Sequence, residues 1–546
     1  MPQEEFTQKE KQILSRFCTN VEGDVFALMN LPDVIKGTLF SRYSRSQKGL
    51  KRLLLDEFIN SSEIDLEAMV GNTEGASQLL AIGKAEKFYE RVLVQYGDDS
   101  VAELGGAHLA LENVSNLATK FIEDRRIGLS PLEKSTRYVY FNEKVNGEYR
   151  YYRDGLIMGS KFADDYIGAC DLLFDTYVRL MGPTEKYFID KFPREEGIGE
   201  RAYEATIRAK VCDTLRGLLP ASTLTNVGLF GNGRAFEYLI TRMRASPLGE
   251  MQSLAKQSYD ELGKVFPVFM KRAYSSHGDA SVEYYRSQKF PELAGQDVGA
   301  GASPRKAACS AYEGKCETPA GAVLADYDRD GVEKVIASIL YSGSHLPMGE
   351  CIKRARQMGA GERAKVISDY VGKRGNRRHR PGRAFENTYY LFDVCANFGA
   401  YRDLHRHRIL TQERQLLTTA NGYDVPQDLE DAGLARDFRE AVENSAAVFQ
   451  KLHAMSPEHA QYVVPFAYRI RWYIRMSLRE AYHLIELRTV RQGHPDYRVI
   501  AQQMYGKIRD VHPELAEGMQ FIDLEMYGLE RIDAERRADR KLSQIG

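Results

Sequence analysis

Two related motifs in the chain carry polar side chains suited to binding an anionic ligand that contains a ring. The first runs from Arg125 to Tyr138 and places Glu133, Ser135 and Arg137 on alternate residues. On an extended strand these three side chains would share one face. A carboxylate, a hydroxyl and a guanidinium on one face could grip a phosphorylated sugar or the amide-like edge of a ring. The alternative is a solvated strand face that holds an ion pair.

The second motif is Arg406-His407-Arg408, with Arg402 and His405 beside it. Clustered guanidiniums suit a pyrophosphate because each can make paired, charge-assisted hydrogen bonds. The alternative is a basic surface patch. A metal site at His405 and His407 is rejected, because the neighbouring arginines would repel a cation. Each motif holds groups that the other lacks, which predicts a pocket built from both parts of the chain and a phosphate-rich ligand.

The similarity between the two halves extends beyond these motifs. Polar residues precede both motifs at equal distances, and in each half an arginine follows an apolar-proline segment after the same interval. The matched pairs are Glu112 and Asp393, Asn116 and Asn397, Arg125 and Arg406, Pro220 and Pro465, and Arg234 and Arg479. An ancestral duplication explains these spacings more economically than a chance pairing of helical segments.

The elements that must position these residues follow from hydrophobic periodicity. Helices are predicted at 76–125, 161–192, 199–219, 232–274, 391–404 and 428–455, and from about 466 onward. Residues 135–141 are rich in β-branched and aromatic side chains, which predicts a strand. Residues 289–323 are rich in Gly, Ala and Pro, as linkers are. We therefore predict two domains, at 1–288 and 324–546.

Composition excludes several classes of protein. The 546 residues include 75 Lys plus Arg and 76 Asp plus Glu, so no overall field draws the chain to nucleic acid or to an anionic membrane. No apolar run approaches the roughly 20 residues of a membrane span. Seven scattered cysteines without a Cys-x-x-Cys motif indicate a reducing cytoplasm. The basic segment 373–383 could touch RNA, but it has few aromatic residues for base stacking, and we expect it near cofactor phosphates.

These motifs resemble the signature of the flavin-dependent thymidylate synthases, which is Arg-His-Arg-x-x-Ser-x-Asn-Glu-x-Ser-x-Arg-Tyr. The first half matches it at Arg125, Ser130, Glu133, Ser135, Arg137 and Tyr138. The second half matches at Arg406, His407 and Arg408, and departs at Arg414, Leu416 and Thr418. Downstream family positions match at Arg216, Asn232, Arg234, Arg479 and Arg488. Asp403 stands where the family has Gln.

The resemblance implies an α+β fold of two homologous domains, each a mostly antiparallel sheet packed with long helices. The family assembles as a tetramer with each site between subunits, so it implies a homodimer of this fused chain. It assigns dUMP or a related pyrimidine nucleotide to Glu133, Ser135, Arg137, Arg216 and Arg488, with Ser135, Arg137 and Arg488 catalytic. The resemblance assigns FAD to Arg406, His407, Arg408, Arg479, Asn232 and Arg234. No metal site is expected, because arginines surround His405 and His407.

The reaction implied by the resemblance is the reductive methylation of dUMP to dTMP, with NADPH and methylenetetrahydrofolate as co-substrates. Three alternatives stay open. The chain could modify another pyrimidine nucleotide or transfer another one-carbon group. It could be a relative that binds flavin and nucleotide without turnover. It could also be a helical RNA-binding protein that uses segment 373–383.

Overall fold

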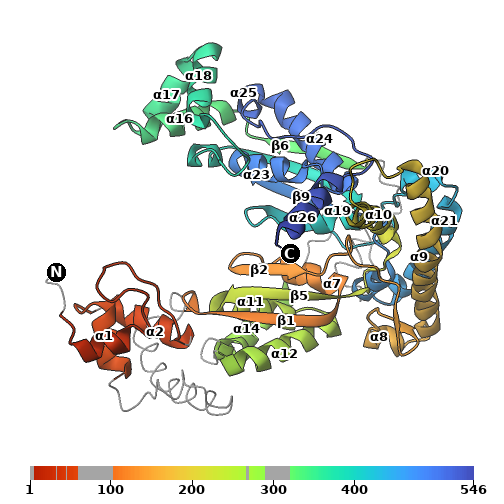
Figure 1. The fold of residues 1–546 in the computed structure, drawn as a ribbon, viewed down its shortest axis with the longest axis horizontal. Helices are drawn as coiled ribbons and strands as arrows, with labels where there is room; N and C mark the ends of the chain where they lie inside the picture. Colours follow the sequence, from red (N-terminus) through yellow and green to blue (C-terminus); the bar gives the residue numbers. More distant parts are fainter. Residues whose placement is uncertain are drawn as a thin grey trace. The chain divides into compact units, whose positions relative to one another are not determined.

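A computed structural model describes residues 5–31, 33–44, 46–59, 102–265, 270–288 and 320–545 (Figure 1). The first part of the helix predicted at 76–125, residues 76–101, lies outside these residues, as does the predicted linker up to residue 319. The linker's last residues, Gly321–Val323, belong to strand β6. The chain divides into two compact units. Unit 1 comprises Met1–Val114, Phe121–Glu133 and Thr225–Phe290, and unit 2 comprises Ser115–Lys120, Lys134–Leu224 and Pro291–Gly546.

Unit 1 is built around a three-stranded sheet in the order β1-β5-β2. Its strands are β1 (Gly106–Ser115), β2 (Leu129–Glu133) and β5 (Leu224–Asn232), and β2 runs antiparallel to β5. Asn232 caps the helix that follows, since its side chain accepts from the Ala235 amide. The unit's other elements are α1 (Gln8–Leu14), α2 (Asp33–Tyr43), α3 (Leu50–Leu53), η1 (Leu54–Ile59), α11 (Gly233–Arg244), α12 (Gly249–Val265), η3 (Lys271–Tyr274) and α14 (Ser276–Ser287). Helix α7 (Asn116–Glu123) is divided between the units.

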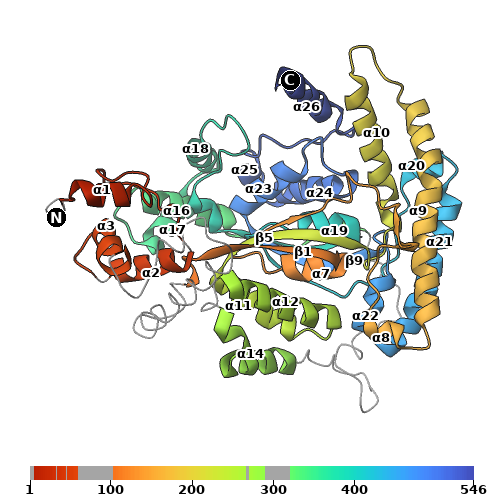
Figure 2. The same cartoon turned by 60° about the horizontal axis from the view of Figure 1, so that its bottom comes forward.

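Unit 2 contains a four-stranded antiparallel sheet in the order β6-β7-β9-β8. Its strands are β6 (Gly321–Tyr327), β7 (Tyr389–Asn397), β8 (Thr411–Arg414) and β9 (Arg469–Ser477). Its longer helices are α9 (Ala163–Lys191), α10 (Glu200–Leu215), α16 (Gly331–Ser342), α17 (Met348–Gln357), α18 (Ala360–Val371), α21 (Ala435–Met455), α23 (Leu478–Arg488), α24 (Pro495–Val511) and α26 (Ile532–Ile545). Helices α9 and α21 lie side by side (Figure 2).

Shorter elements complete unit 2. They are β3 (Lys144–Val145), β4 (Glu148–Tyr149), α8 (Gly155–Met158), η2 (Arg216–Leu218), η4 (Arg383–Glu386), α19 (Phe398–Leu404), α20 (Gln427–Asp431), α22 (Pro457–Ala460), η5 (Gln461–Val463) and α25 (Pro513–Ala516). Among the residues that the structure describes, no helix is both long and apolar enough to span a membrane.

The two halves repeat one order of elements. In the first half β1 leads to α7 and β2, and later β5 leads to α11. In the second half β7 leads to α19 and β8, and later β9 leads to α23. The sheet orders β1-β5-β2 and β7-β9-β8 correspond strand for strand. The predicted α+β fold of two homologous domains is therefore confirmed.

Within unit 2 the two halves meet with local two-fold symmetry. An antiparallel bridge joins Pro220 to Pro465, the two prolines matched from the sequence. Two backbone hydrogen bonds of 2.9 Å flank this bridge, one from the Ala221 amide to the Val464 carbonyl and one from the Phe466 amide to the Leu219 carbonyl. Exchanging the halves converts one bond into the other. The duplicated segments therefore pair with each other as two subunits of a symmetric dimer would.

Several sequence-based assignments of secondary structure are wrong. The helices predicted across 106–115, 391–397 and 469–477 are strands β1, β7 and β9. Short apolar runs fit the periodicity of a helix as well as that of a buried strand, and pairing with a distant strand decides which of the two forms. The strand predicted at 135–141 is a turn that follows β2. Glu133, Ser135 and Arg137 therefore do not alternate on one strand face. The helices predicted at 161–192, 199–219 and 428–455 are confirmed.

Candidate functional site

Asp403, at the end of α19, is surrounded by arginines from both halves of the chain. It is 8% exposed, and its carboxylate lies 2.6 Å from Arg406 Nη2 and 3.3 Å from Arg216 Nη1. Burial opposes its ionisation, but the charges of Arg406, Arg216, Arg137 and Arg488 hold the pKa of Asp403 well below its usual range. Two of these arginines come from the first half and two from the second, and all of them lie in unit 2.

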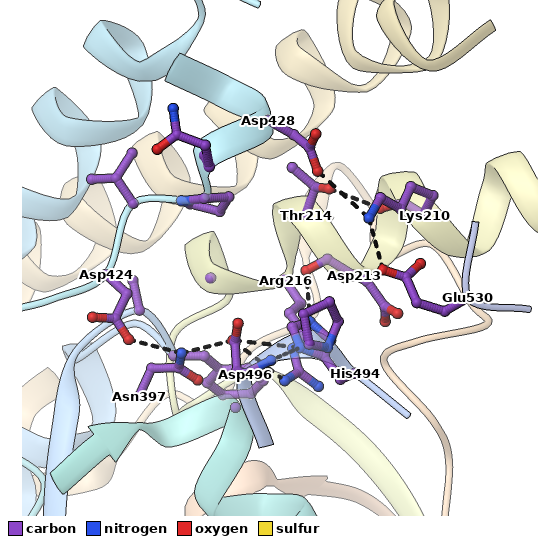
Figure 3. Close-up of a pocket in the computed structure, with 18 of the residues that line it drawn as sticks. Lys210, Asp213, Thr214, Arg216, Asn397, Asp424, Asp428, His494, Asp496 and Glu530 are labelled. Carbon is purple, nitrogen blue, oxygen red and sulfur yellow. Dashed lines mark hydrogen bonds and ion pairs between the residues drawn. The ribbon is translucent and has the colours of Figure 1, made fainter. Parts of the chain in front are cut away.

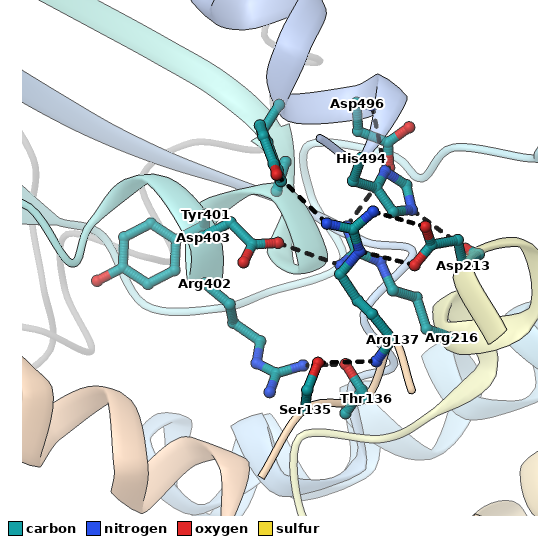
Figure 4. Close-up of polar contacts among 12 residues, drawn as sticks. Ser135, Thr136, Arg137, Asp213, Arg216, Tyr401, Arg402, Asp403, His494 and Asp496 are labelled. Carbon is teal, nitrogen blue, oxygen red and sulfur yellow. Dashed lines mark hydrogen bonds and ion pairs between the residues drawn. The ribbon is translucent and has the colours of Figure 1, made fainter. Parts of the chain in front are cut away.

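Arg137 is held by a buried carboxylate on α10 (Figure 4). Its Nε and Nη2 donate to the two oxygens of Asp213, at 2.8 and 2.7 Å. Burial alone would raise the pKa of Asp213, yet the Arg137 charge keeps it far below its usual range. Arg137 Nη1 lies 3.3 Å from the hydroxyl of Tyr497 on α24. This tertiary pairing explains why the residues after β2 turn inward instead of continuing the strand.

The two arginines expected to be catalytic meet at one tyrosine. The guanidinium carbon of Arg137 is 5.7 Å from the ring centre of Tyr497, and that of Arg488 is 5.6 Å from it. Arg488 ends α23, and its Nε donates to His407 Nε2 at 2.9 Å. His407 Nδ1 lies 3.0 Å from Glu480 Oε1. Arg137 from the first half and Arg488 from the second therefore lie beside the same tyrosine; their expected catalytic roles stay a prediction.

Arg216 lines a cavity of about 670 Å³ (Figure 3). The side chain is 3% exposed, and its Nη2 has no hydrogen-bond partner among the described residues. The nearest carboxylate oxygen beyond Asp403 is on Asp496, at 4.0 Å. A Cβ on Gly399 would lie 3.0 Å from this guanidinium, so the glycine makes room for it. A buried donor that is unsatisfied and borders a cavity is expected to bind a ligand oxygen or water.

The other cations that line this cavity have carboxylate partners. Lys210 pairs with Glu530 at 3.0 Å, and Arg469 pairs with Asp424 at 2.6 Å. The lining comes from both halves, because it includes Arg216 and Gly217 as well as Gly399 and Asp496. The cavity volume falls within the range of about 300–1,000 Å³ that is typical of small-molecule sites.

The remaining predicted site residues have different surroundings. Ser135 accepts the Arg137 amide at 3.2 Å within the turn. Arg479 donates to the Pro381 carbonyl at 2.9 Å, and Arg408 is exposed. Glu133, Asn232 and Arg234 belong to unit 1, where Glu133 ends β2, Asn232 caps α11 and Arg234 pairs with Glu103 at 2.7 Å.

The basic segment predicted near cofactor phosphates lies against α23. Arg380 Nη2 is 3.2 Å from His483 Nε2. Burial, reinforced by the charges of Arg380, Arg377 and Arg488, lowers the pKa of His483 to about 4. Burial is the larger cause of this shift, and the positive charge of these guanidiniums adds to it. Such a group of guanidiniums is suited to an anion such as a pyrophosphate.

One cluster on this side has the spacing of a cation site. Potential ligand atoms of His407, Glu480 and His483 lie within 4.8 Å of one another. However, both ring nitrogens of His407 are in hydrogen bonds, and Arg380 and Arg488 adjoin the cluster. These positive charges and occupied donor atoms do not favour a metal ion.

Sequence reasoning missed the acidic members of this site. Asp213 and Asp496 belong to no motif, and Tyr497 is nineteen positions beyond the start of α23 at Leu478. Asp403 was visible as a departure from the family's Gln, but its role as the centre of four arginines depends on contacts between distant segments.

Comparison with known proteins identifies the family. A model of the Thy1 family, described as thymidylate synthase complementing protein, matches residues 54–268 and 324–514. This chain belongs to the Thy1 family. The resemblance inferred from its motifs is therefore confirmed, and the two matched segments correspond to its two halves.

Similar proteins include three UPF0159 proteins. One from Chlamydia pneumoniae is 43% identical over 542 residues, 98% of this chain and 99% of that protein. One from Chlamydia muridarum is 42% identical over 98% of each chain. UPF0159 protein Ta1429 of Thermoplasma acidophilum is 34% identical over 93% of this chain and 99% of its own length.

Among solved structures, the UMP/dUMP methylase PolB from Streptomyces cacaoi, bound with 5-Br dUMP, is 19% identical to this Thy1 protein. It covers 37% of this chain and 94% of that chain with a TM-score of 0.29. A likeness this weak carries no argument about the site.

Proposed function

We propose that this Thy1 protein is a flavin-dependent thymidylate synthase that converts dUMP to dTMP. Methylenetetrahydrofolate would donate the carbon and NADPH would supply reducing equivalents. The supporting observation is the convergence of Arg137 and Arg216 with Arg406 and Arg488 around Asp403, beside a cavity lined by both halves. Neither half of the chain holds this set alone.

The protein's own residues would bind and polarise the nucleotide. The Nη2 of Arg216, which makes no hydrogen bond among the described residues, would donate to a phosphate oxygen. Carbon transfer to C5 of uracil builds negative charge on the pyrimidine, and guanidiniums held at its carbonyl edge stabilise that charge. Arg137 and Arg488 are the candidates, because both are held beside Tyr497. Ser135 would orient the nucleotide through its hydroxyl.

The residues on the other side of this cluster fit FAD. Arg406, Arg408 and Arg479 would hold its pyrophosphate, with Arg380 of the basic segment nearby. The observation that supports the fit is the position of Arg380, whose Nη2 lies 3.2 Å from His483 Nε2. Burial is the larger cause of the lowered pKa of His483, and the charges of Arg380, Arg377 and Arg488 add to it. His407 would contribute less than the family pattern implies, since its ring nitrogens are already engaged. Bound FAD would supply the hydride-transfer chemistry that side chains lack.

A reconstituted assay tests the proposal. Purified protein is incubated with FAD, dUMP, methylenetetrahydrofolate and NADPH, and dTMP is measured by chromatography. The expected result is a yellow protein that forms dTMP. Arg408→Ala should lose flavin, whereas Arg137→Gln should keep flavin and weaken dUMP binding at least about tenfold. The matched control is Arg471→Gln, which alters a partly exposed pair with Asp393. A protein that takes up no FAD and forms no dTMP would refute the proposal.

A second outcome of the same assay has structural support. Asp403 replaces the family's Gln and places a carboxylate among the arginines of the nucleotide site. This change favours a diverged specificity, so other uridine and cytidine nucleotides belong in the assay. Two copies of the chain would form the homodimer that reproduces the family's four-domain assembly, which light scattering can measure.

A further inference from the structure

The contacts of His407 define a directed hydrogen-bond chain across helix α23. Arg488 Nε lies 2.9 Å from His407 Nε2, and a guanidinium can only donate. His407 Nε2 must therefore be the unprotonated acceptor, which places the ring proton on Nδ1. Nδ1 lies 3.0 Å from Glu480 Oε1, so its N–H donates to that oxygen. The chain runs from Arg488 through His407 to Glu480.

Glu480 and Arg488 form no direct hydrogen bond or ion pair with each other among the described contacts. They occupy the two ends of α23, which runs from Leu478 to Arg488, and eight residues of helix span about 12 Å. His407 comes from the segment after α19 and bridges them. His407 and Glu480 are each 5% exposed, so water does not compete for these bonds.

We propose that Glu480 is a positioning residue, which fixes the His407 tautomer and thereby the guanidinium that Arg488 presents to a bound pyrimidine. The inference deepens the proposed function and rests on it for the identity of that ligand. With Nε held by His407, the two terminal nitrogens of Arg488 remain for Tyr497 and the ligand. Preorganised donors of this kind stabilise developing charge without reorganising during the reaction.

The protonation state of Glu480 makes the hydrogen bonds between Arg488, His407 and Glu480 depend on pH. Burial raises the pKa of Glu480 to about 7, and the charges of Arg380 and Arg479 oppose that rise. His407 and His483 also face it within the same cluster. Protonated Glu480 can donate to Nδ1, which moves the ring proton to Nε2, where it opposes the Arg488 N–H. Acidification through neutrality therefore releases Arg488.

The first test needs no ligand. Urea titrations measure the unfolding equilibrium of Glu480→Leu, Arg488→Met and the double variant. Each is made both with the natural His407 and in a His407→Phe background. Residues without contact normally act additively. We expect at least about a fivefold departure from additivity in the unfolding equilibrium constant with His407 present, and additivity with His407→Phe. Additivity in both backgrounds would overturn the proposal.

The second test measures dUMP binding by calorimetry at roughly pH 6 and roughly pH 8, on either side of the Glu480 pKa. Glu480→Gln keeps the shape and mimics the protonated acid. We expect it to weaken binding about tenfold at the higher pH, and little at the lower pH. The ratio to the natural chain cancels titration of the dUMP phosphate. Glu333→Gln, which breaks a pair with Arg363, is the control and should give a ratio that does not change with pH.

The two tests separate the hydrogen-bond relay, which runs from Arg488 through His407 to Glu480, from the proposed function. A pH-independent ratio for Glu480→Gln indicates a merely structural role and overturns the proposal. Coupling through His407 without any dUMP binding leaves the relay in place and rejects the proposed substrate. Binding of dUMP without coupling rejects the relay and leaves the proposed function in place.

Discussion

Replacing Asp403 by Asn should destabilise unit 2 strongly. The substitution removes the carboxylate among four arginines but keeps the side chain's size. At an effective dielectric constant of about 20, Coulomb attraction is about 6 kcal/mol at the 2.6 Å of Arg406 and about 5 kcal/mol at the 3.3 Å of Arg216. The amide oxygen keeps part of this interaction. We therefore expect a loss of about 3–5 kcal/mol in the free energy of unfolding, as for other broken buried pairs.

The chain offers a convenient probe for this measurement. Trp472 is its single tryptophan, is 1% exposed and lies on β9 of unit 2, so its fluorescence reports unfolding of that unit. Urea titrations give the free energy from the midpoint and slope. Asp437→Asn is the control, because it breaks an exposed pair with Arg179 and should cost no more than about 1 kcal/mol. A loss for Asp403→Asn no larger than that of the control would refute the central role of this carboxylate.

Three further predictions follow from the same contacts. The pKa of Asp403 is lower in the folded than in the unfolded protein, so the stabilisation from its carboxylate is present above about pH 4 and is lost as the pH falls through lower values. Urea titrations should therefore show that the unfolding free energies of the natural chain and Asp403→Asn converge in acid. Gly399→Ala should push the Arg216 guanidinium aside and weaken nucleotide binding at least about tenfold by calorimetry, with the circular dichroism spectrum unchanged. Arg374→Met should cost about 3–5 kcal/mol in urea unfolding, because it strands the charge of Glu486, which Arg374 contacts with two bonds of 2.6 Å in the core.

The sequence alone identified the family and predicted that residues from both halves of the chain contribute to one site. Equal spacings around Pro220 and Pro465 predicted a duplication, and the bridge between these prolines is consistent with it. The uneven loss of motif residues predicted that Arg137 and Arg488 serve one site; the structure places both beside Tyr497, and their joint action stays a prediction. The family inference succeeded because spacing within a motif is local information that survives divergence.

Tertiary structure decided what surrounds those residues. The apolar runs of β1, β7 and β9 fit a helix as well as a strand until their partners in the sheet are known. The residues after β2 turn because Arg137 reaches Asp213 on α10, seventy-six positions away. Asp403, Tyr497 and Glu480 acquire their roles only through such distant contacts. Burial and pairing energies depend on which segments meet in space, and the amino-acid order by itself does not state which segments those are.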